Sequence, residues 1–372
     1  MQDIKKQLVI FNQFFYPAFK AGGPVKSLNL LYKSLKNKFN IFVFTSQKDI
    51  DNKKIFFKNK KLISSNNFFF VIINSFRLLV NLNTKAIINF NSFFSFNFTI
   101  LPLIIIKIFF SKKFFLIISP RGELFSETLQ YKFIKKKIYI KIFKIFLSKN
   151  LIFHATSKQE YISIKNLFPK NKICILPNLI EKKNFSLNDK RYYSKNLKFV
   201  FFSRITKKKR LERVINILSK INHNLVLDIY GPIENHLYWK KIKYLMKSKK
   251  NKIFKINYKG IIFKDIYNVI KRYNFFIFLS KSENFGHVIF EAMQSGCIPI
   301  LSENMPWKII EKKRCGVMLS ENDKIAKKKL EKFLKKMNSH NYFVHLKNLK
   351  KLNEKIIKEN NSIMYLNFYN KL

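Results

Sequence analysis

Short apolar runs alternate with amphipathic or polar segments along most of the chain. The runs at 8–12, 114–118 and 275–279 hold almost no polar residue, which is typical of strands buried on both faces of a parallel sheet. Similar runs predict strands at 41–45, 68–73, 86–90, 151–155, 173–176, 199–202, 225–230, 253–258, 298–301 and 315–319. Strands that alternate with helices predict an α/β protein whose doubly wound parallel sheets are covered by helices.

Helical patterns lie between these runs. The first predicted helix begins near Val25. Further helices are predicted at 92–110, 130–147, 235–247, 264–272 and 286–295, and over much of the chain beyond Asn322. Pro24 suits the first turn of a helix, and Gly296 is the residue type expected at a left-handed C-cap. Ser157 and Glu160 fit a capping box. We interpret His154 as a buried core histidine.

The length of 372 residues exceeds a usual single domain, so we expect two domains. A polar, charged stretch without periodicity begins at Glu181, which is typical of a linker. We therefore predict a first domain at 1–180, a linker at 181–197, a second domain at 198–350 and a final helix at 351–372.

The formal net charge is +52, because 73 Lys and Arg stand against only 21 Asp and Glu. Such a charge favours an anionic partner such as nucleic acid or an anionic membrane. A biased genome is the alternative, since Lys, Asn, Ile and Phe have AT-rich codons and the chain holds 42 Phe but only 8 Gly. Both interpretations stay open on this evidence.

Cys174, Cys297 and Cys315 are odd in number and lack CxxC spacing, so we expect reduced thiols in a cytoplasmic protein. The N-terminus lacks the apolar segment and the cleavage site of a signal peptide. The longest apolar stretch, 100–110, is interrupted by Lys107 and is shorter than the ~20 residues that spanning a bilayer requires. These features predict a soluble or peripheral protein.

Two of the helical patterns fit more than one setting. The pattern at 92–110 suits a helix buried in the core, which we prefer, or a helix on a membrane with Lys107, Lys112 and Lys113 at the headgroups. The basic pattern at 130–147 suits a solvated helix, or a patch that docks on anionic lipid. The sequence leaves both alternatives open.

A strand, a polar loop, a helix and a second strand are predicted for the stretch FFIFLSKSENFGHVIFEAMQSGCIPILSEN. Glu283 in the loop and Glu291 in the helix form an E-x(7)-E pattern. The backbone amides of Asn284, Phe285 and Gly286 open the helix, and free amides at a helix N-terminus bind phosphate. Glu291 can accept from two hydroxyls, as a ribose diol requires. The alternative is an ordinary surface loop followed by a packed helix.

Cationic residues follow two further predicted strands. Arg204 and Lys209 come after the strand at 199–202, where two cations can neutralise a diphosphate; a basic loop is the alternative. Arg121 follows a strand in the sequence SPRGEL. Because Arg is permanently charged, it can clamp a phosphate or an anionic acceptor, or it can form a structural salt bridge. Glu123 in the same loop is a weaker candidate.

The run SENFGHVIFEAMQSGCIPI closely resembles the donor-binding segment of retaining glycosyltransferases with the GT-B fold, family 4 in particular. The segment SRITKKKR resembles that family's SR-x(4)-K-G motif, in which Arg and Lys hold the donor diphosphate, but Arg210 replaces the usual Gly. The strand, Gly22-Gly23 loop and helix near the N-terminus, the PRG sequence and the Gly231-Pro232 pair resemble further positions of the family.

The resemblance implies two Rossmann-like domains facing across a cleft, with the final helix returning to the first domain. It implies a retaining, metal-independent hexosyltransferase that moves a sugar from a nucleotide-diphosphate sugar to a glycan or lipid-linked acceptor, in surface polysaccharide or lipopolysaccharide synthesis. The implied catalytic residues are Glu283, Arg204, Lys209 and Arg121, and the implied donor-binding residues are Gly23, Gly231, Asn284, Phe285, Gly286 and Glu291. No cofactor beyond the sugar nucleotide is implied. The expected location is the cytoplasm, with peripheral contact at the inner face of an anionic membrane.

One possible metal site and two alternative functions accompany this hypothesis. Asp49-Ile50-Asp51 is a DxD, a pattern that holds a divalent metal in another glycosyltransferase fold, but its Lys-rich surroundings lead us to expect no metal site here. A sugar-nucleotide epimerase or hydrolase on the same fold would consume the donor without an acceptor. A nucleic-acid-binding protein would explain the charge, but no recognised nucleic-acid motif is present.

Overall fold

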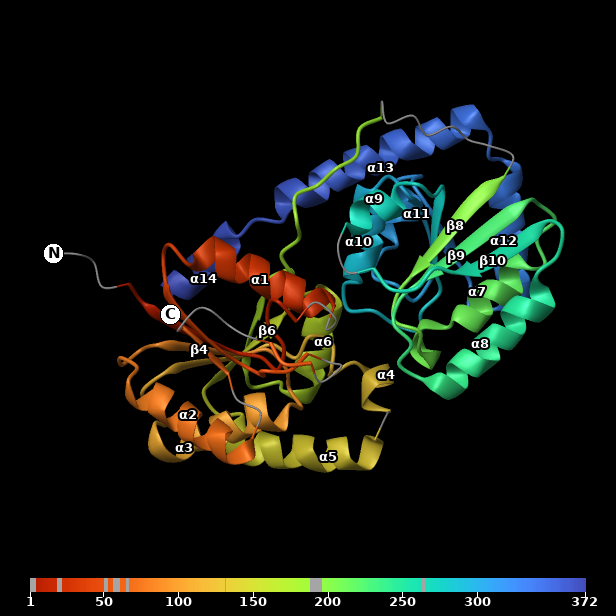
Figure 1. The fold of residues 1–372 in the computed structure, drawn as a ribbon. Helices are drawn as coiled ribbons and strands as arrows, with labels where there is room; N and C mark the ends of the chain where they lie inside the picture. Colours follow the sequence, from red (N-terminus) through yellow and green to blue (C-terminus); the bar gives the residue numbers. More distant parts are fainter. Residues whose placement is uncertain are drawn as a thin grey trace. The chain divides into compact units, whose positions relative to one another are not determined.

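The computed structural model describes residues 5–18, 22–49, 53–55, 61–64, 67–130, 132–187, 196–262 and 265–372. It divides into two compact units, each built around its own sheet (Figure 1). The N-terminal unit comprises Met1–Glu181 with Asn360–Leu372, and the C-terminal unit comprises Lys182–Glu359. Residues 188–195 of the predicted linker lie outside the described residues. The predicted α/β class with two Rossmann-like halves is confirmed.

Parallel strands form a seven-stranded sheet in the N-terminal unit, in the order β3-β2-β1-β4-β5-β6-β7. The strands are β1 (Gln7–Phe11), β2 (Asn40–Thr45), β3 (Leu62–Ser64), β4 (Ile87–Phe90), β5 (Phe115–Ile118), β6 (Leu151–Ala155) and β7 (Lys172–Ile175). The helices are α1 (Gly23–Leu35), α2 (Phe68–Val80), α3 (Leu101–Phe109), α4 (Ser126–Leu129), α5 (Phe133–Ile142), α6 (Lys158–Leu167) and α14 (Ile363–Asn370), with the π-helical turns η2 (Phe96–Ile100) and η3 (Phe143–Leu147).

The C-terminal unit carries a six-stranded parallel sheet in the order β10-β9-β8-β11-β12-β13. Its strands are β8 (Leu197–Phe202), β9 (Leu225–Tyr230), β10 (Phe254–Tyr258), β11 (Phe275–Phe278), β12 (Ile298–Ser302) and β13 (Val317–Leu319). Its helices are η4 (Lys207–Lys209), α7 (Leu211–Leu218), α8 (His236–Lys249), α9 (Ile266–Ile270), α10 (His287–Gln294), α11 (Ile309–Lys312), α12 (Asp323–Lys335) and α13 (Ser339–Glu359).

Side chains alternate between the two faces of the N-terminal sheet, because successive strand residues point to opposite sides. Leu8 and Ile10 of β1 join the core on the side of α1 and α14, whereas Val9 and Phe11 join the core on the side of α2, α3 and α5 (Figure 1). Both sets are fully buried. This double burial explains why the strands are unbroken apolar runs rather than alternating ones.

The prediction of a strand at 68–73 is wrong, because these residues begin α2. The Asn67 side chain caps this helix by accepting from the N–H of Phe69 at 3.1 Å. The buried residues between Val71 and Leu79 follow helical spacing. A run of six apolar residues fits a strand or a helix equally well until its inward face is known. The sheet instead takes β3 from a short segment that the pattern did not predict.

The two ambiguous helical patterns also form helices in the N-terminal unit. The pattern at 92–110 contains η2 and α3, and the pattern at 130–147 contains α5 followed by η3. Among the residues that the structure describes, no helix has both the length and the apolar character that crossing a membrane requires.

Local turn chemistry follows the sequence in part. Gly296 has φ +67, the left-handed conformation predicted for a C-cap. Ser157 Oγ accepts from the N–H of Glu160 at 3.1 Å, as a capping box requires. The Glu160 carboxylate accepts instead from the N–H of Gly122 at 2.5 Å and of Thr156 at 2.7 Å. It therefore ties the loop after β5 to the start of α6.

The last helix, α14, packs in the N-terminal unit beside α1 (Figure 1). Tyr365 and Tyr369 are both buried there. Asn89 Nδ2 donates to the Tyr369 hydroxyl at 2.8 Å, and the Tyr365 hydroxyl donates to the carbonyl of Pro177 at 3.0 Å. Burial raises the pKa of Tyr365 to about 12, so this phenol stays neutral at ordinary pH.

We expect Tyr369→Phe to destabilise the N-terminal unit by about 1–3 kcal/mol, because it leaves Asn89 Nδ2 buried without its acceptor. Hydrogen exchange of the β4 amides should accelerate by roughly 5- to 150-fold. Tyr244→Phe, on the exposed surface of α8, is the matched control and should change exchange by less than about twofold. An unchanged β4 rate in Tyr369→Phe would show that this hydrogen bond contributes nothing.

Candidate functional site

Two turns meet at the carboxyl edge of the C-terminal sheet. β8 and β11 are neighbouring parallel strands, and the strand order reverses between them. Ligands of doubly wound sheets bind at such a switch point. The N–H of Lys281 donates to the carbonyl of Lys208 at 3.0 Å, and Ser280 Oγ donates to the same carbonyl at 3.2 Å. The residues that follow one strand are thereby fixed against those that follow the other.

Lys209 and Glu283 form an ion pair across these two turns. Their side chains are only 11% and 15% exposed. Lys209 Nζ also lies 5.3 Å from the centre of the Phe278 ring. Removing two charges from water is costly, and leaving either one without its partner would cost more. The sequence placed both residues at the site, but nothing in it predicted that they bind each other.

Arg204 is held on a more exposed surface. Its Nη1 donates to Glu234 Oε1 at 2.8 Å, and the two side chains are 46% and 30% exposed. Ion pairs this exposed contribute about 0–1 kcal/mol, so an anionic ligand can displace Glu234. The N–H of Ile205 donates to the carbonyl of Pro232 at 2.8 Å, which keeps the turn after β8 beside the turn after β9.

Arg210 stands where the resembled motif has glycine, and it adopts the conformation that glycine favours, with φ +55. Its guanidinium donates to Glu321 at 2.5 Å, and Arg213 binds the same carboxylate at 3.3 Å. Although burial opposes ionisation, hydrogen bonds from Ser302 and Arg210 hold the pKa of Glu321 below its usual value. Glu321 therefore holds the Arg210 guanidinium, as Glu283 holds Lys209 and Glu234 holds Arg204, and a contact between Arg210 and the donor phosphates stays open.

Gly231 follows β9 with φ +141. A Cβ atom there would lie 1.8 Å from the carbonyl oxygen of Ser203, so the two turns pack backbone to backbone. The Tyr258 hydroxyl donates to the carbonyl of Gly231 at 3.0 Å. Gly231 therefore shapes the turn that carries Arg204, and its contact with a donor stays a prediction.

The start of α10 lies directly after Glu283. Gly286 is the N-cap with φ +74, and the N–H of Ile289 donates to its carbonyl at 2.8 Å. The carbonyl of Phe285 accepts from Trp307 Nε1 at 2.6 Å. The ring centroids of Phe285 and Trp307 are 5.2 Å apart. These contacts fix the backbone that presents the first amides of the helix.

Asn284 precedes the N-cap of α10 and Glu291 lies within the helix, and both are partly exposed. The structure thus places Arg204 and Lys209 on the same turn after β8, and only Lys209 contacts Glu283 in the loop after β11. Sequence reasoning missed Glu234 and Glu321, the acidic partners of the arginines. Their positions could have revealed them, since Glu234 and Glu321 each follow a predicted strand of the sheet that carries the arginines.

Arg121 lies at the carboxyl edge of the N-terminal sheet, with φ +56. Its Nη2 donates to Asn91 Oδ1 at 2.7 Å, and its Nη1 donates to Asn178 Oδ1. Both partners are neutral amides, so they orient the guanidinium without neutralising its charge. Its Nε is buried with no hydrogen-bond partner among the described residues. This arrangement is compatible with a clamp for an anion.

The start of α1 is tied to the same amide. Ser27 Oγ donates to Asn178 Oδ1 at 3.3 Å. Gly22 is the N-cap of α1 with φ +82, and Gly23 is its first residue. The first turns of α1 and Arg121 are therefore linked through Ser27 and Asn178. Sequence reasoning missed Asn178, although it follows a predicted strand. Residues 19–21 of the predicted loop lie outside the described residues.

His154 is buried behind Arg121, and its interpretation as a core histidine is confirmed. Its Nδ1 lies 2.8 Å from Ser119 Oγ, and its Nε2 lies 2.8 Å from the carbonyl oxygen of Leu176. Burial, with a smaller effect from the charge of Arg121, lowers the pKa of His154 to about 3. The imidazole is therefore neutral at physiological pH.

Glu123 is a structural carboxylate. It accepts from the N–H of Phe93 at 2.5 Å, from the N–H of Phe94 at 3.1 Å and from Ser92 Oγ at 2.9 Å. Burial raises its pKa, against the effect of these bonds. The contacts hold the segment after β4 in place, which argues against Glu123 as a site residue.

The DxD pattern is described only at Asp49, because Ile50 and Asp51 lie outside the described residues. Within the described ranges, no group of three or more His, Cys, Asp or Glu is placed to hold a metal ion. The expectation that no metal is needed stays a prediction.

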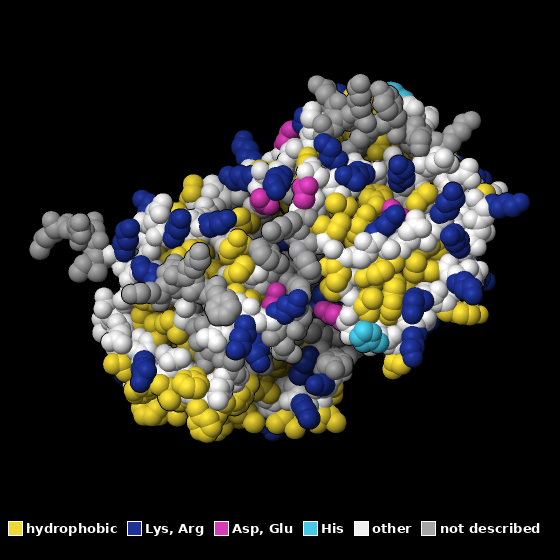
Figure 2. All heavy atoms as spheres, viewed as in Figure 1, with side chains coloured by type: hydrophobic (Ala, Val, Ile, Leu, Met, Phe, Trp, Pro, Cys, Tyr) yellow, Lys and Arg dark blue, Asp and Glu magenta, His cyan; other side chains and the backbone are white. Residues whose placement is uncertain are grey.

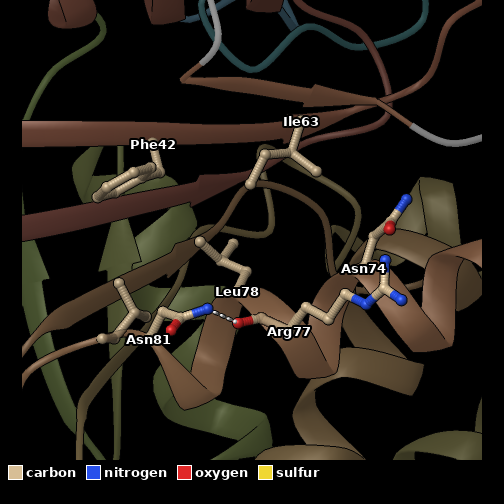
Figure 3. A pocket seen from close by; sticks show the side chains of 7 residues that line it. Phe42, Ile63, Asn74, Arg77, Leu78 and Asn81 are labelled. Atoms are coloured by element: carbon tan, nitrogen blue, oxygen red, sulfur yellow. Dashed lines mark hydrogen bonds between the residues drawn. The ribbon is translucent and has the colours of Figure 1, made fainter.

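A pocket of about 290 Å³ opens in the N-terminal unit between α2 and strands β2 and β3. Figure 3 shows Phe42 and Ile63 on the strand side, with Leu78 across from them and Arg77 and Asn74 to one side. None of the predicted site residues lines this pocket. We therefore place the candidate chemistry at the strand edges.

Comparisons with known proteins point to the same unit. Residues 181–357, nearly the whole C-terminal unit, match the sequence model of the family described as glycosyl transferases group 1. A comparison with curated protein sequences gave no match.

Solved structures share the fold along the full chain. Sucrose-phosphate synthase from Thermosynechococcus elongatus gives a TM-score of 0.75 at 11% identity, covering 99% of each chain. Anabaena HepE, in complex with UDP and glucose, gives 0.71 at 13% identity, covering 97% of this chain and 99% of that one. WaaG, a glycosyltransferase involved in lipopolysaccharide biosynthesis, gives 0.69 at 12% identity, covering 93% and 95%. The fold is GT-B. The predicted fold class is thus confirmed, whereas membership of family 4 stays a prediction.

Gly231→Ala should destabilise the C-terminal unit by more than about 3 kcal/mol, because backbone must move to relieve the contact with Ser203. Gly260→Ala is the matched control, since Gly260 also has a positive φ but has open space around it, so strain alone should cost about 1–2 kcal/mol. Unfolding can be followed by the fluorescence of Trp239 and Trp307, which both lie in this unit. An equal loss of unfolding free energy in the two variants would contradict the close approach of Gly231 to the Ser203 carbonyl.

Acid should destabilise the N-terminal unit through His154. Its folded pKa of about 3 lies below its ordinary value of 6.5, so its contribution to stability is complete above pH 6.5 and is lost as the pH falls toward 3. Urea unfolding followed by circular dichroism should show a loss of up to about 1.4 kcal/mol per pH unit in this window. His154→Asn should flatten this dependence and exposed His340→Asn should not. An identical slope in His154→Asn would refute the assignment.

Proposed function

We propose that the chain is a retaining glycosyltransferase of family 4 that moves a sugar from a nucleotide-diphosphate sugar to a glycan or lipid-linked acceptor. The observation that carries the proposal is the Lys209–Glu283 pair, held beside the start of α10 at the switch point of the C-terminal sheet. The match of residues 181–357 to glycosyl transferases group 1 supports it.

The donor diphosphate would lie between the turn after β8 and the start of α10. Arg204 and Lys209 supply two cations, and the backbone amides of 284–286 would join them just before the N-terminus of α10, where the helix dipole is positive. Negative charge grows on the leaving diphosphate as its bond to the sugar breaks. Donors fixed in advance therefore stabilise the transition state more than the bound donor. In this proposal they take the part that a divalent metal plays in other enzymes.

Glu283 would act on both the enzyme and the sugar. Through Oε1 it holds the Lys209 ammonium, and through its carboxylate it would accept from a sugar hydroxyl. Glu291 would accept from the two hydroxyls of the ribose. Anabaena HepE has been solved with UDP-glucose, which makes UDP-glucose the first donor to test.

The residues proposed for the acceptor lie in the N-terminal unit. Arg121 keeps its full charge for an anionic group, and the backbone near Gly23 would bind phosphate. The acceptor hydroxyl would attack the anomeric carbon from the face that the diphosphate leaves, and its proton would pass to the departing phosphate oxygen. The new bond then has the configuration of the old one, and no separate general base is required.

The proposed setting is surface polysaccharide or lipopolysaccharide synthesis at the cytoplasmic face of a membrane. WaaG, which shares the fold, is involved in lipopolysaccharide biosynthesis. The formal charge of +52 favours an anionic acceptor or an anionic surface nearby. No cofactor other than the sugar nucleotide enters the proposal.

A thermal-shift screen against UDP-, GDP-, ADP- and TDP-sugars should identify the donor. With that donor, we expect Lys209→Met to lower turnover about 10²–10³-fold, because it removes a cation from the leaving diphosphate. We expect a similar loss in Glu283→Gln, because it removes the carboxylate that holds the Lys209 ammonium in place and that would accept from the sugar hydroxyl. Exposed Lys207→Met, two residues away, is the matched control and should keep normal turnover.

The double variant Lys209→Met/Glu283→Gln separates folding from catalysis. It removes both charges together, so the unfolding temperature should recover toward that of the native chain while turnover stays low. Turnover equal to that of the native chain would contradict the proposal. Release of free sugar at the same rate with and without every acceptor tested would favour the hydrolase alternative.

A further inference from the structure

α2 exposes an apolar face to solvent. Phe69, Ile73, Phe76 and Val80 recur at spacings of four, three and four residues, so they share one side of the helix. Their side chains are 68%, 44%, 39% and 50% exposed. The opposite side of α2 is buried in the core of the N-terminal unit. An amphipathic helix is expected to turn its polar side to water, and here the outward side is apolar.

α5 and η3 repeat the pattern. Ile134, Ile138, Ile142 and Ile145 lie on one side and are 72%, 55%, 49% and 64% exposed. The inward side is represented by Phe143, which is fully buried. Packing within the N-terminal unit does not explain the exposed isoleucines, because that packing uses the side of the helix that carries Phe143.

These helices and α3 form one continuous surface. The rings of Phe76 on α2 and Phe109 on α3 are 5.6 Å apart. Lys107 on α3 donates to the carbonyl of Lys149, just beyond η3. In Figure 2 hydrophobic side chains gather along the lower edge of the N-terminal unit, where Figure 1 draws α2, α3 and α5. We call this surface the apolar face; it consists of the exposed large hydrophobic residues of α2, η2, α3, α5 and η3.

The concentration of apolar residues there is high. The described residues expose 28 large hydrophobic side chains, and 15 of them belong to the apolar face: six on α2, three on η2 and α3, and six on α5 and η3. Contiguous exposed apolar surface of this kind marks a binding surface for a protein or a membrane.

Charge decides between these two occupants. α2, η2, α3, α5 and η3 contain no Asp or Glu, while Lys137, Lys141 and Lys144 flank the isoleucine stripe at spacings of four and three. A second copy of the chain would bring this basic surface against itself and be repelled. An anionic surface complements it, and long lysine side chains can reach phosphates while the apolar side chains enter a nonpolar layer.

We propose that the apolar face docks on an anionic lipid bilayer, with α2, α3 and α5 lying in the plane of the interface. The hydrophobic ends of these helices would enter the boundary between headgroups and acyl chains, and the lysines would bind lipid phosphates. The inference rests on this surface alone and is independent of the proposed reaction.

The test uses the full chain and flotation with two kinds of vesicle, phosphatidylcholine alone and phosphatidylcholine mixed with phosphatidylglycerol. The chain should bind the mixed vesicles, and binding should weaken as NaCl is added. Ile134→Ser/Ile138→Ser should reduce binding more than about tenfold. Leu237→Ser/Tyr244→Ser, an equally exposed pair on α8, is the matched control and should leave binding unchanged.

Charge is tested in the same way. Lys137→Ala/Lys141→Ala/Lys144→Ala should reduce binding roughly 100-fold, at about fivefold per lysine. Lys241→Ala/Lys243→Ala/Lys247→Ala on α8 removes the same charge and should have little effect. Donor binding measured without vesicles should be the same in every variant, which separates a failure of docking from a failure of the proposed function.

Three results would overturn the inference. The first is no binding to the mixed vesicles. The second is an equal loss in the α8 controls, which would mean that net charge alone attracts the chain to lipid. The third is a dimer in sedimentation velocity that Ile134→Ser/Ile138→Ser separates, with no vesicle binding by the native chain, which would make the face an interface between copies.

Discussion

The ion pair between Lys209 and Glu283 is the contact on which the candidate site depends. It joins the turn after β8 to the loop after β11, and it is almost excluded from water. Such a pair contributes little net stability, because desolvation offsets the attraction, but separating its partners is costly. The pair acts by fixing positions. Together with the backbone hydrogen bond from Lys281 to Lys208, it holds the Lys209 ammonium group beside the start of α10.

Parallel sheets make this arrangement possible in both units. All carboxyl ends lie at one edge, so residues distant in sequence are brought together by strand order. In the C-terminal unit this edge carries charged pairs, Arg204 with Glu234 and Arg210 with Glu321. In the N-terminal unit the edge carries the Arg121 guanidinium, which donates to the amide oxygens of Asn91 and Asn178. The first edge therefore suits a ligand that displaces or joins ion pairs, and the second presents a guanidinium for which these two hydrogen-bond acceptors are neutral.

The sequence predicts the strands well, because strands buried on both faces must be unbroken apolar runs. The same rule fails at α2, where six apolar residues begin a helix whose outer side is also apolar, so its periodicity is hidden. Lys209, Glu283 and the start of α10 were named through the resemblance of their segments to a known donor-binding motif, because spacing alone left ordinary loops as the alternative. Their partners were not, since Glu321 lies 111 residues from Arg210 and meets it only through the order of the strands. Asn91 and Asn178 are hidden in the same way.

The most direct test of the account is a crystal structure of the chain soaked with UDP. We predict density for the two phosphates within hydrogen-bond distance of Lys209 Nζ and of the backbone amides at 284–286, with Arg204 turned from Glu234 toward the ligand. UDP bound elsewhere, with the Lys209–Glu283 and Arg204–Glu234 pairs undisturbed and no phosphate at the start of α10, would contradict the central claim.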